Sequence, residues 1–378
     1  MPCTFNYIDT GEGLEALITR LRPIQIVALD TEADSLHHYY EKVCLIQLSF
    51  SRETCIVDPL ADVNLVPLLD LLAEKTLLIH GAEYDLRMLR AGYHFVPRGE
   101  VFDTMLAAQL VEGEARSLVA LAIDYLGIEL TKQKQRSDWS CRPLSEDQLT
   151  YACNDTRYLA PIADHLKREL QILGRLEWHR ESCRRMVKAT ARDKTPLDPD
   201  RVWRIKGLRE LDRRQLAFVR EIWHWREKEA QKADLPPFKV MGNQLIIDLA
   251  LWASHGRGRS LAGRPKLPRT CSGTRLRGLE QALTRARAMH EPEWPQFRVG
   301  NNYVHPEYGP ELDLLRDRCA HLALELGIEP SLIASRKQME SITLARPASA
   351  SALQKAGELM DWQVALLMPI AAEIFGSR

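Results

Sequence analysis

Apolar positions along the first half of the chain follow a strand-like pattern that later alternates with a helical one. Short β-branched and apolar runs are typical of buried strands, and leucine or alanine at helical spacing indicates helices. The strand-like runs are residues 24–30, 43–50, 54–57, 76–80 and 101–102. The helix-like segments are residues 65–72, 84–91, 104–111, 117–126 and 146–170, the last opened by Ser145 as N-cap with Gln148 at its third position. Short links between the first three runs predict an antiparallel meander, and the later alternation predicts a mixed α/β sheet.

The second half of the chain is helical, because strand signals stop near residue 176. Residues 204–233 carry apolar side chains along one helical face. Residues 235–250 and residues 327–345 each lead from the end of a long helix through a proline turn into a second amphipathic helix. This repeat indicates either two tandem helical modules or two unrelated hairpins. The Gly/Arg/Pro-rich stretch 255–275 predicts a loop or a disordered segment.

The composition, with 45% apolar and 27% charged residues, is that of an ordinary globular protein. No apolar run is long enough to span a bilayer, and the N-terminus lacks the basic and apolar regions of a secretory signal. The eight cysteines show no C-x-x-C spacing, which argues against a zinc knuckle and a disulfide framework and suits a reducing cytosol. We therefore expect a cytoplasmic protein without a membrane partner.

The net charge of zero hides an uneven distribution. Residues 1–200 carry 23 basic and 31 acidic side chains, residues 201–290 carry 20 and 8, and residues 291–378 carry 8 and 12. An acidic N-terminal half followed by a basic region is typical of a metal-using nuclease with an additional nucleic-acid-binding region. A basic stretch that is only a solvated face is the alternative.

Three segments contribute acidic side chains that could form one site. Asp30 and Glu32 lie two apart at the end of a predicted strand, so both side chains leave the same face. Two carboxylates this close repel each other unless a cation neutralises them. Tyr151 and Asp155 lie four apart on one face of a predicted helix, and Asp85 lies early in another. Each feature alone has a structural explanation, such as a solvated strand end or an acid favoured near a helix N-terminus.

Together these motifs resemble those of the DEDD exonuclease superfamily, Tyr subclass. The motifs are Asp30-Thr31-Glu32, HGAEYD at 80–85 and YACND at 151–155. The segments CLIQLS (44–49), FDTMLAA (102–108) and the stretch 137–159 resemble the ribonuclease D family in particular. Residues 211–237 resemble the helical HRDC domain that follows the nuclease in that family, and the second helical module resembles a degenerate copy.

The resemblance implies an RNase H-like, mixed-sheet α/β exonuclease domain over residues 1–190. It implies two all-α domains after it, one HRDC-like over residues 200–290 and one divergent HRDC-like over residues 300–378. The implied activity is 3′→5′ hydrolysis of terminal phosphodiesters to 5′-mononucleotides. The implied partners are tRNA precursors or other structured RNA 3′ ends, and we expect a monomer.

The cofactors implied by the resemblance are two divalent cations, Mg²⁺ or Mn²⁺, which all-oxygen ligands favour over zinc. By resemblance, Asp30, Glu32 and Asp155 bind one cation. Asp30 and Asp85 hold the other, so that Asp30 bridges the two. Tyr151 would hydrogen-bond and orient the attacking water, because a phenol is a poor base at neutral pH but a good positioner.

Six further residues are candidate substrate contacts. Tyr39 and Tyr40 lie in an aromatic loop after the first motif, where they could stack the terminal base or pack the turn. His80 could orient the second motif, although a core histidine is the more common explanation. The basic candidates that could line the phosphate path before the third motif are Lys134, Arg136 and Arg142.

Two alternatives to an exoribonuclease stay open. A DNA-directed 3′→5′ exonuclease in repair or proofreading would use the same site. An inactive RNA-binding module would use the basic middle of the chain, although the intact five-residue site speaks against it. The chain has no G-x-x-x-x-G-K-[ST] motif, which favours a free-standing processing enzyme.

Overall fold

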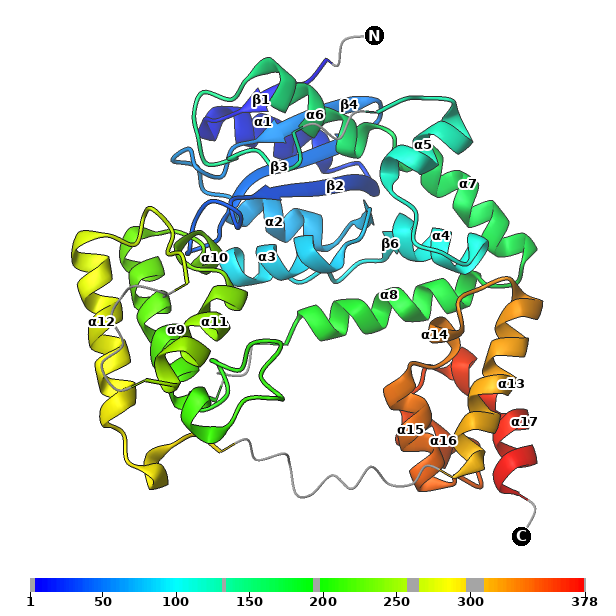
Figure 1. Cartoon of the computed structure of the whole chain (residues 1–378). Coiled ribbons are helices and arrows are strands. Elements are labelled where there is room, and N and C mark those ends of the chain that lie inside the picture. The colour runs from blue at the N-terminus through cyan, green and yellow to red at the C-terminus, as the bar shows by residue number, and fades with distance from the viewer. Residues whose placement is uncertain (1–3, 131–133, 193–197, 257–264, 297–308, 377–378) are drawn as a thin grey trace. The chain divides into compact units, whose positions relative to one another are not determined.

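The computed structural model describes residues 4–130, 134–192, 198–256, 265–296 and 309–376. Within these residues the chain forms two compact units. Residues 4–33, 43–192 and 309–376 form the first unit, and residues 34–42 and 198–296 form the second. Figure 1 labels the elements of both. Each unit has its own apolar core, and each is described by itself.

A six-stranded sheet lies at the centre of the first unit, with the strand order β1-β4-β3-β2-β5-β6. β2, β3 and β4 are antiparallel, whereas β5 continues parallel to β2 and β6 parallel to β5. The predicted meander and mixed sheet are therefore confirmed. The strands are β1 (Asn6–Ile8), β2 (Ile26–Ala33), β3 (Val43–Phe50), β4 (Glu53–Val57), β5 (Thr76–Ile79) and β6 (Val101–Asp103).

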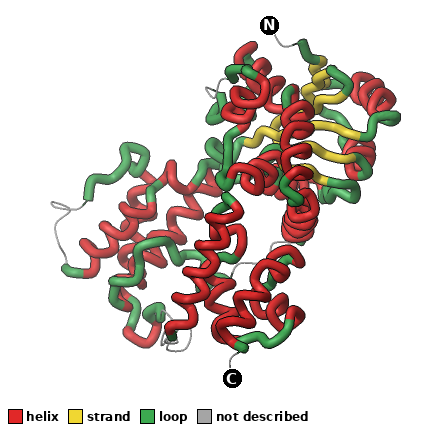
Figure 2. Tube along the Cα trace, turned by 90° about the vertical axis from the view of Figure 1, so that its right-hand side faces the viewer, coloured by secondary structure: helices red, strands yellow, loops and turns green. Residues whose placement is uncertain are grey.

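Helices cover both faces of this sheet, as Figure 2 shows. One apolar core joins the sheet to α1, α2 and α3, and a second joins it to α4, α5 and α7. α6 lies over β2, β3 and β4. The helices are α1 (Gly11–Leu21), α2 (Val66–Ala73), α3 (Glu83–Tyr93), α4 (Thr104–Glu112), α5 (Leu118–Leu126), α6 (Glu146–Arg157), α7 (Leu159–Ile172) and α8 (Leu176–Thr190).

The predicted single helix over residues 146–170 is wrong, because α6 and α7 are separate helices that meet at Tyr158. Pro161 lies in the first turn of α7, where its missing N–H is tolerated because the first N–H groups of a helix have no internal acceptor. In the middle of one long helix the same proline would remove a backbone hydrogen bond. The strand β1 and the helix α1 were not predicted at all.

The second unit is helical and is built around α9 (Arg213–Ala233). The helix predicted from residue 204 begins nine residues later, since Asp212 caps it and forms a capping box with Gln215. Gly207, before this cap, has a φ of +100°, which takes the backbone out of the right-handed helical region. The other elements are α10 (Pro237–Val240), α11 (Asn243–Ser254), α12 (Gly273–Ala288) and the 3₁₀ turn Glu291–Glu293.

The C-terminal helices pack on the exonuclease-like part within the first unit. They are α13 (Pro310–Leu326), α14 (Pro330–Ile333), α15 (Arg336–Ala345), α16 (Ala350–Gly357) and α17 (Asp361–Phe375). Buried Arg175 donates to the carbonyls of Leu110 and Leu326, which joins α4 to α13. The indoles of Trp178 and Trp362 stack with their centroids 4.8 Å apart. No helix of the described residues is both long and apolar enough to cross a bilayer.

The stack of Trp178 on Trp362 predicts a stability effect. Trp362→Ala should lower the thermal unfolding midpoint, because removing a buried tryptophan costs about 3 kcal/mol or more. Leu324→Ala is the control, since Leu324 lies on α13 with 81% of its surface exposed and should change little. Equal midpoints for the two variants, measured by differential scanning calorimetry, would contradict a structural role for the stack.

Candidate active site

The candidate site begins on β2, which lies between β3 and β5 in the middle of the sheet. Asp30 and Glu32 are two residues apart, so their side chains leave the same face, as predicted. Pairing with β5 ends at Ala28, whereas pairing with β3 continues to Ala33. Asp30 and Glu32 therefore project where β2 has passed its parallel neighbour, on backbone that β3 still holds.

The third motif reaches the same place from α6. Ser145 caps this helix and forms a capping box with Gln148, as the sequence predicted. The hydroxyls of Thr156 and Ser49 are hydrogen-bonded at 2.7 Å, which fixes α6 over β3. One carboxylate oxygen from each of Asp30, Glu32 and Asp155 lies within 4.8 Å of the other two.

Tyr151 lies one turn before Asp155 on α6 and hydrogen-bonds to its carboxylate. The Tyr151 ring packs near Trp139, with the ring centroids 6.0 Å apart, and Trp139 is itself 1% exposed. The phenol is therefore held from both ends, by a buried indole and by an acid of the candidate site.

Asp85 is buried in the first turn of α3 and is tied to the first motif. The backbone N–H and the hydroxyl of Thr31 both donate to Asp85 Oδ1, at 3.0 and 2.6 Å. The middle residue of the D-x-E motif thus holds the acid of the second motif. Sequence reasoning gave Thr31 no role, because nothing in the sequence shows which acid lies beside it.

Asp103 is a further buried acid that sequence reasoning missed. Its carboxylate accepts from the N–H groups of Gly81 and Ala82, at 3.0 and 2.8 Å, just before α3. The same carboxylate caps α4. An aspartate directly before a helix is a recognisable N-cap signal, so its place could have been predicted. Gly81 has a φ of +75°, a conformation that favours glycine in this turn.

Burial raises the pKa of Asp30 and of Glu32 well above their usual values. The negative charges of Asp85 and Asp155 raise both further, and Glu32 adds to the effect on Asp30. Such a group holds protons at pH values where separate carboxyls would be ionised. A divalent cation would remove this cost by neutralising the charges.

The other two acids have hydrogen bonds that oppose the same effect. Burial raises the pKa of Asp85 to about 7, although the two bonds from Thr31 lower it. Burial likewise raises the pKa of Asp155 to about 7, against the bond from Tyr151. Burial and the neighbouring carboxylates raise the pKa of Tyr151, so its hydroxyl stays protonated at neutral pH.

The donor set fits a hard divalent cation rather than zinc, because it offers carboxylate oxygens and neither histidine nor cysteine. A buried amide, Gln47, faces the same side of the sheet as Asp30. Neither its Oε1 nor its Nε2 has a hydrogen-bond partner among the described residues. Oxygen ligands beside an unsatisfied polar group are consistent with a site that completes its contacts when loaded.

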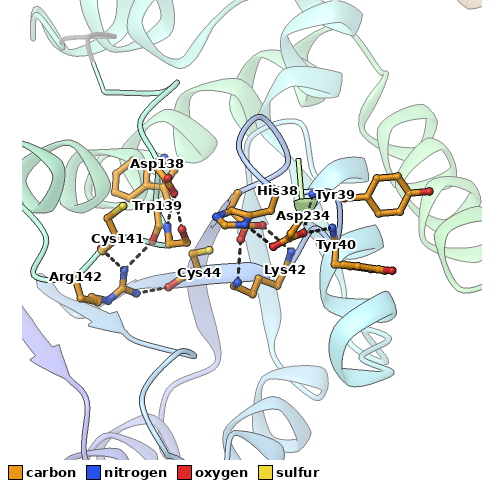
Figure 3. Close-up of polar contacts among 12 residues, drawn as sticks. His38, Tyr39, Tyr40, Lys42, Cys44, Asp138, Trp139, Cys141, Arg142 and Asp234 are labelled. Atoms are coloured by element: carbon orange, nitrogen blue, oxygen red, sulfur yellow. Dashed lines mark hydrogen bonds and ion pairs between the residues drawn. The ribbon is translucent and has the colours of Figure 1, made fainter. Parts of the chain in front are cut away.

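The aromatic candidates Tyr39 and Tyr40 belong to the second unit. Their backbone N–H groups donate to Asp234 at the end of α9, and His38 Nδ1 lies 2.7 Å from the same carboxylate (Figure 3). The Tyr39 hydroxyl lies 3.3 Å from Glu227 of α9, whereas Tyr40 is 63% exposed. The structure therefore supports packing of this turn, and base stacking stays a prediction.

His80 directly follows β5, and its Nδ1 lies 2.9 Å from the Thr104 hydroxyl. This contact holds the start of α4 to the end of β5, which agrees with the structural explanation for the histidine. A contact with substrate stays a prediction.

Arg142, the third basic candidate, is bound to several groups of the first unit. It forms a two-pronged ion pair with Asp58, at 2.6 and 2.7 Å. It also donates to the carbonyls of Cys44, Trp139 and Cys141 (Figure 3). A guanidinium has five N–H groups, so these bonds use its donors. These bonds hold the segment before α6 against the sheet, and a contact of Arg142 with phosphate stays a prediction.

The other two basic candidates lie in the same segment. Lys134 pairs with Asp147 of α6 at 3.2 Å, and the Arg136 side chain is exposed. Both cations stand before the third motif, and their contact with phosphate stays a prediction.

Comparison with known proteins agrees with this geometry. A family model described as 3′-5′ exonuclease matches residues 5–171, and a model of the HRDC domain matches residues 215–253. The match to HRDC falls on α9, α10 and α11 of the second unit.

Ribonuclease D of Gluconacetobacter diazotrophicus is 30% identical to this chain over 343 residues, which cover 89% of the chain and 86% of that protein. Ribonuclease D of Desulfotalea psychrophila is 29% identical over 89% of the chain and 90% of that protein. The crystal structure of Escherichia coli RNase D, an exoribonuclease involved in structured RNA processing, has a TM-score of 0.70 and 26% identity, covering 97% of this chain and 99% of that one. A Bifidobacterium adolescentis protein shares the fold, with a TM-score of 0.81 and 22% identity over 98% of this chain and 97% of that one. The chain belongs to the ribonuclease D family and is a 3′→5′ exoribonuclease.

Proposed function

We propose that this exoribonuclease trims the 3′ ends of structured RNAs, tRNA precursors among them, at the site formed by Asp30, Glu32, Asp85, Tyr151 and Asp155. The observation that carries the proposal is the approach of oxygens from Asp30, Glu32 and Asp155 to within 4.8 Å of one another. The E. coli relative, described as acting in structured RNA processing, supports the substrate class. A DNA-directed alternative is not favoured, since the curated relatives are ribonucleases.

The proposed cofactors are two divalent cations, Mg²⁺ or Mn²⁺, which when bound would polarise the phosphodiester and stabilise charge on the attacking and leaving oxygens. Asp30, Glu32 and Asp155 would hold one and Asp30 with Asp85 the other. Thr31 fixes the orientation of Asp85 toward the first motif.

The Tyr151 hydroxyl is proposed to position the attacking water. Its raised pKa keeps the proton on the phenol, so the group works as a hydrogen-bond donor rather than as a base. The bond to Asp155 and the packing on Trp139 limit the directions in which the hydroxyl can point. Positioning of this kind contributes to rate because it fixes the reacting atoms before reaction.

The proposal extends to the domain boundaries, the location and the oligomeric state. We keep the exonuclease domain at 1–190 and the HRDC-like domains at 200–290 and 300–378, supported for the middle domain by the match at 215–253. The cytoplasmic location and the monomeric state are proposals that rest on the sequence alone.

Loss of a proposed ligand should abolish degradation of RNA. Asp155→Asn should reduce kcat by more than the roughly 100-fold typical of losing an outer hydrogen-bond partner of a metal site, since a direct ligand is removed. Asp70→Asn, an exposed position on α2, is the matched control. The measurement uses a 3′-extended tRNA precursor, matched single-stranded RNA and matched DNA. Activity retained in Asp155→Asn would refute the site, and a preference for DNA would refute the substrate class.

Removal of the phenol should separate positioning from binding. Tyr151→Phe keeps the ring near Trp139 and removes only the hydroxyl. We expect kcat to fall by about 10- to 100-fold with KM for RNA nearly unchanged, as for a group that acts mainly in the transition state. A fall confined to KM in steady-state kinetics would show that Tyr151 binds substrate instead.

The raised pKa values predict how the stability of the metal-free protein depends on pH. In the folded state Asp85 and Asp155 hold protons up to about pH 7, whereas in the unfolded chain they release them near the ordinary value of 3.8. The folded state is thus favoured at low pH, and its stability falls by about 1.4 kcal/mol per unit of pKa difference as the pH rises from the unfolded pKa to the folded pKa of about 7.

The unfolding midpoint in EDTA should therefore fall as the pH rises from about 4 to about 7 and then level off. Asp155→Asn should flatten this fall, and Mn²⁺ should reduce it in the unmodified protein. A midpoint that rises over this range in EDTA would contradict the carboxyl repulsion.

A further inference from the structure

Gln47 lies in the middle of β3 and is fully buried, with 0% of its surface exposed. The antiparallel register places it directly opposite Asp30 of β2 and, on its other side, opposite Ile56 of β4. Directly opposed residues of antiparallel strands present their side chains on the same face, with Cβ atoms about 5 Å apart. Gln47 is therefore the neighbour of Asp30 on the carboxylate face of the sheet.

Among the described residues, the neighbours of Gln47 along β3 and across on β4 offer it no unengaged polar group on this face. Leu45 and Ile56 are apolar and belong to the core beneath α6. Ser49, two residues along β3, is engaged with Thr156 of α6. Within the described residues, both polar atoms of the Gln47 amide are buried without a partner.

The Asp30 carboxylate, in turn, lacks a hydrogen-bond donor among the described residues. Thr31 donates to Asp85, and Tyr151 hydrogen-bonds to Asp155. No hydrogen bond to the Asp30 carboxylate occurs in the described part of the chain. A carboxylate has about four lone-pair positions, so a ligand shared by two cations still has positions for a hydrogen-bond donor.

We propose that Gln47 is a positioning residue for Asp30: in the cation-loaded site its amide N–H donates to the Asp30 carboxylate and holds it toward Glu32 and Asp155. The inference rests on the proposed function, because it assigns a partner to the ligand proposed to bridge the cations. Groups that hydrogen-bond to a metal ligand orient it, and their loss typically weakens metal binding by about 10- to 100-fold.

The cost of the buried amide supports this assignment over simple packing. An amide buried without a hydrogen bond is unfavourable, and an apolar side chain of similar shape fits the same space without that cost. Gln47 lies between apolar neighbours on β3 and β4, where such a side chain would suit the core. Opposite Asp30, by contrast, the amide has an acceptor within reach.

The test is a Mn²⁺ titration of the full-length Gln47→Met variant. Methionine has a similar length and flexibility and removes only the amide. Mn²⁺ binding is followed without turnover, by electron paramagnetic resonance of free Mn²⁺, and steady-state kinetics on single-stranded RNA are recorded alongside. Asp70→Asn is the control, because Asp70 is exposed on α2 and has no part in the candidate site. Gln47→Leu repeats the measurement if the methionine variant does not fold.

For Gln47→Met we expect half-saturating Mn²⁺ to rise about 10-fold or more, with lower kcat and unchanged KM for RNA. The metal-free unfolding midpoint should be unchanged or higher, because an unsatisfied amide has been removed. Asp70→Asn should leave both that midpoint and the Mn²⁺ requirement as they were.

A Mn²⁺ requirement within about twofold of the unmodified protein, in a folded Gln47 variant, would overturn the inference and leave Gln47 as a core residue. Equal Mn²⁺ binding by the unmodified protein and Asp155→Asn would overturn the proposed metal site itself. The two failures are therefore distinguishable in one set of titrations.

Discussion

Repulsion among carboxyl groups in one buried site is the constraint on which the first unit depends. Four acids come from β2, α3 and α6, and burial raises the pKa of each of them. No local segment would hold such groups together, because separation lowers their energy. The sheet, its covering helices and the two bonds from Thr31 supply the restraint. The fold therefore holds the four carboxyl groups in an arrangement that is unfavourable without cations. Bound cations would make the same arrangement favourable.

Elements with a strong local signal could be predicted from the sequence. The three meander strands are long apolar runs, and the Ser145–Gln148 capping box marks the start of α6. The failures have physical causes. β1 has three residues, too few to show a period, and the helix predicted over 146–170 ignored how Pro161 is tolerated only near a helix start. The helix α9 was predicted to begin too early, because the apolar pattern continues upstream of its N-cap Asp212.

The candidate site divides in the same way. Spacing and resemblance indicated the candidate acids and Tyr151, because the residues of each motif lie within one short segment of the sequence. The roles of Thr31 and Gln47 depend on which residue lies across a strand pair or at a helix start, and this register is not visible in one sequence. Arg142 was assigned to phosphate from its chemistry alone, whereas its partner Asp58 lies 84 residues away.

Buried Arg175 has a consequence for the modularity of the chain. Its guanidinium spans from the carbonyl of Leu110, in the nuclease part, to that of Leu326, at the end of α13. A nuclease shortened before α13 would remove the Leu326 acceptor of Arg175 and would leave the Trp178 indole without its stacking partner. The C-terminal helices therefore could not be replaced by another domain without loss of these contacts. A minimal catalytic fragment of this protein would carry an uncovered indole where α17 now packs.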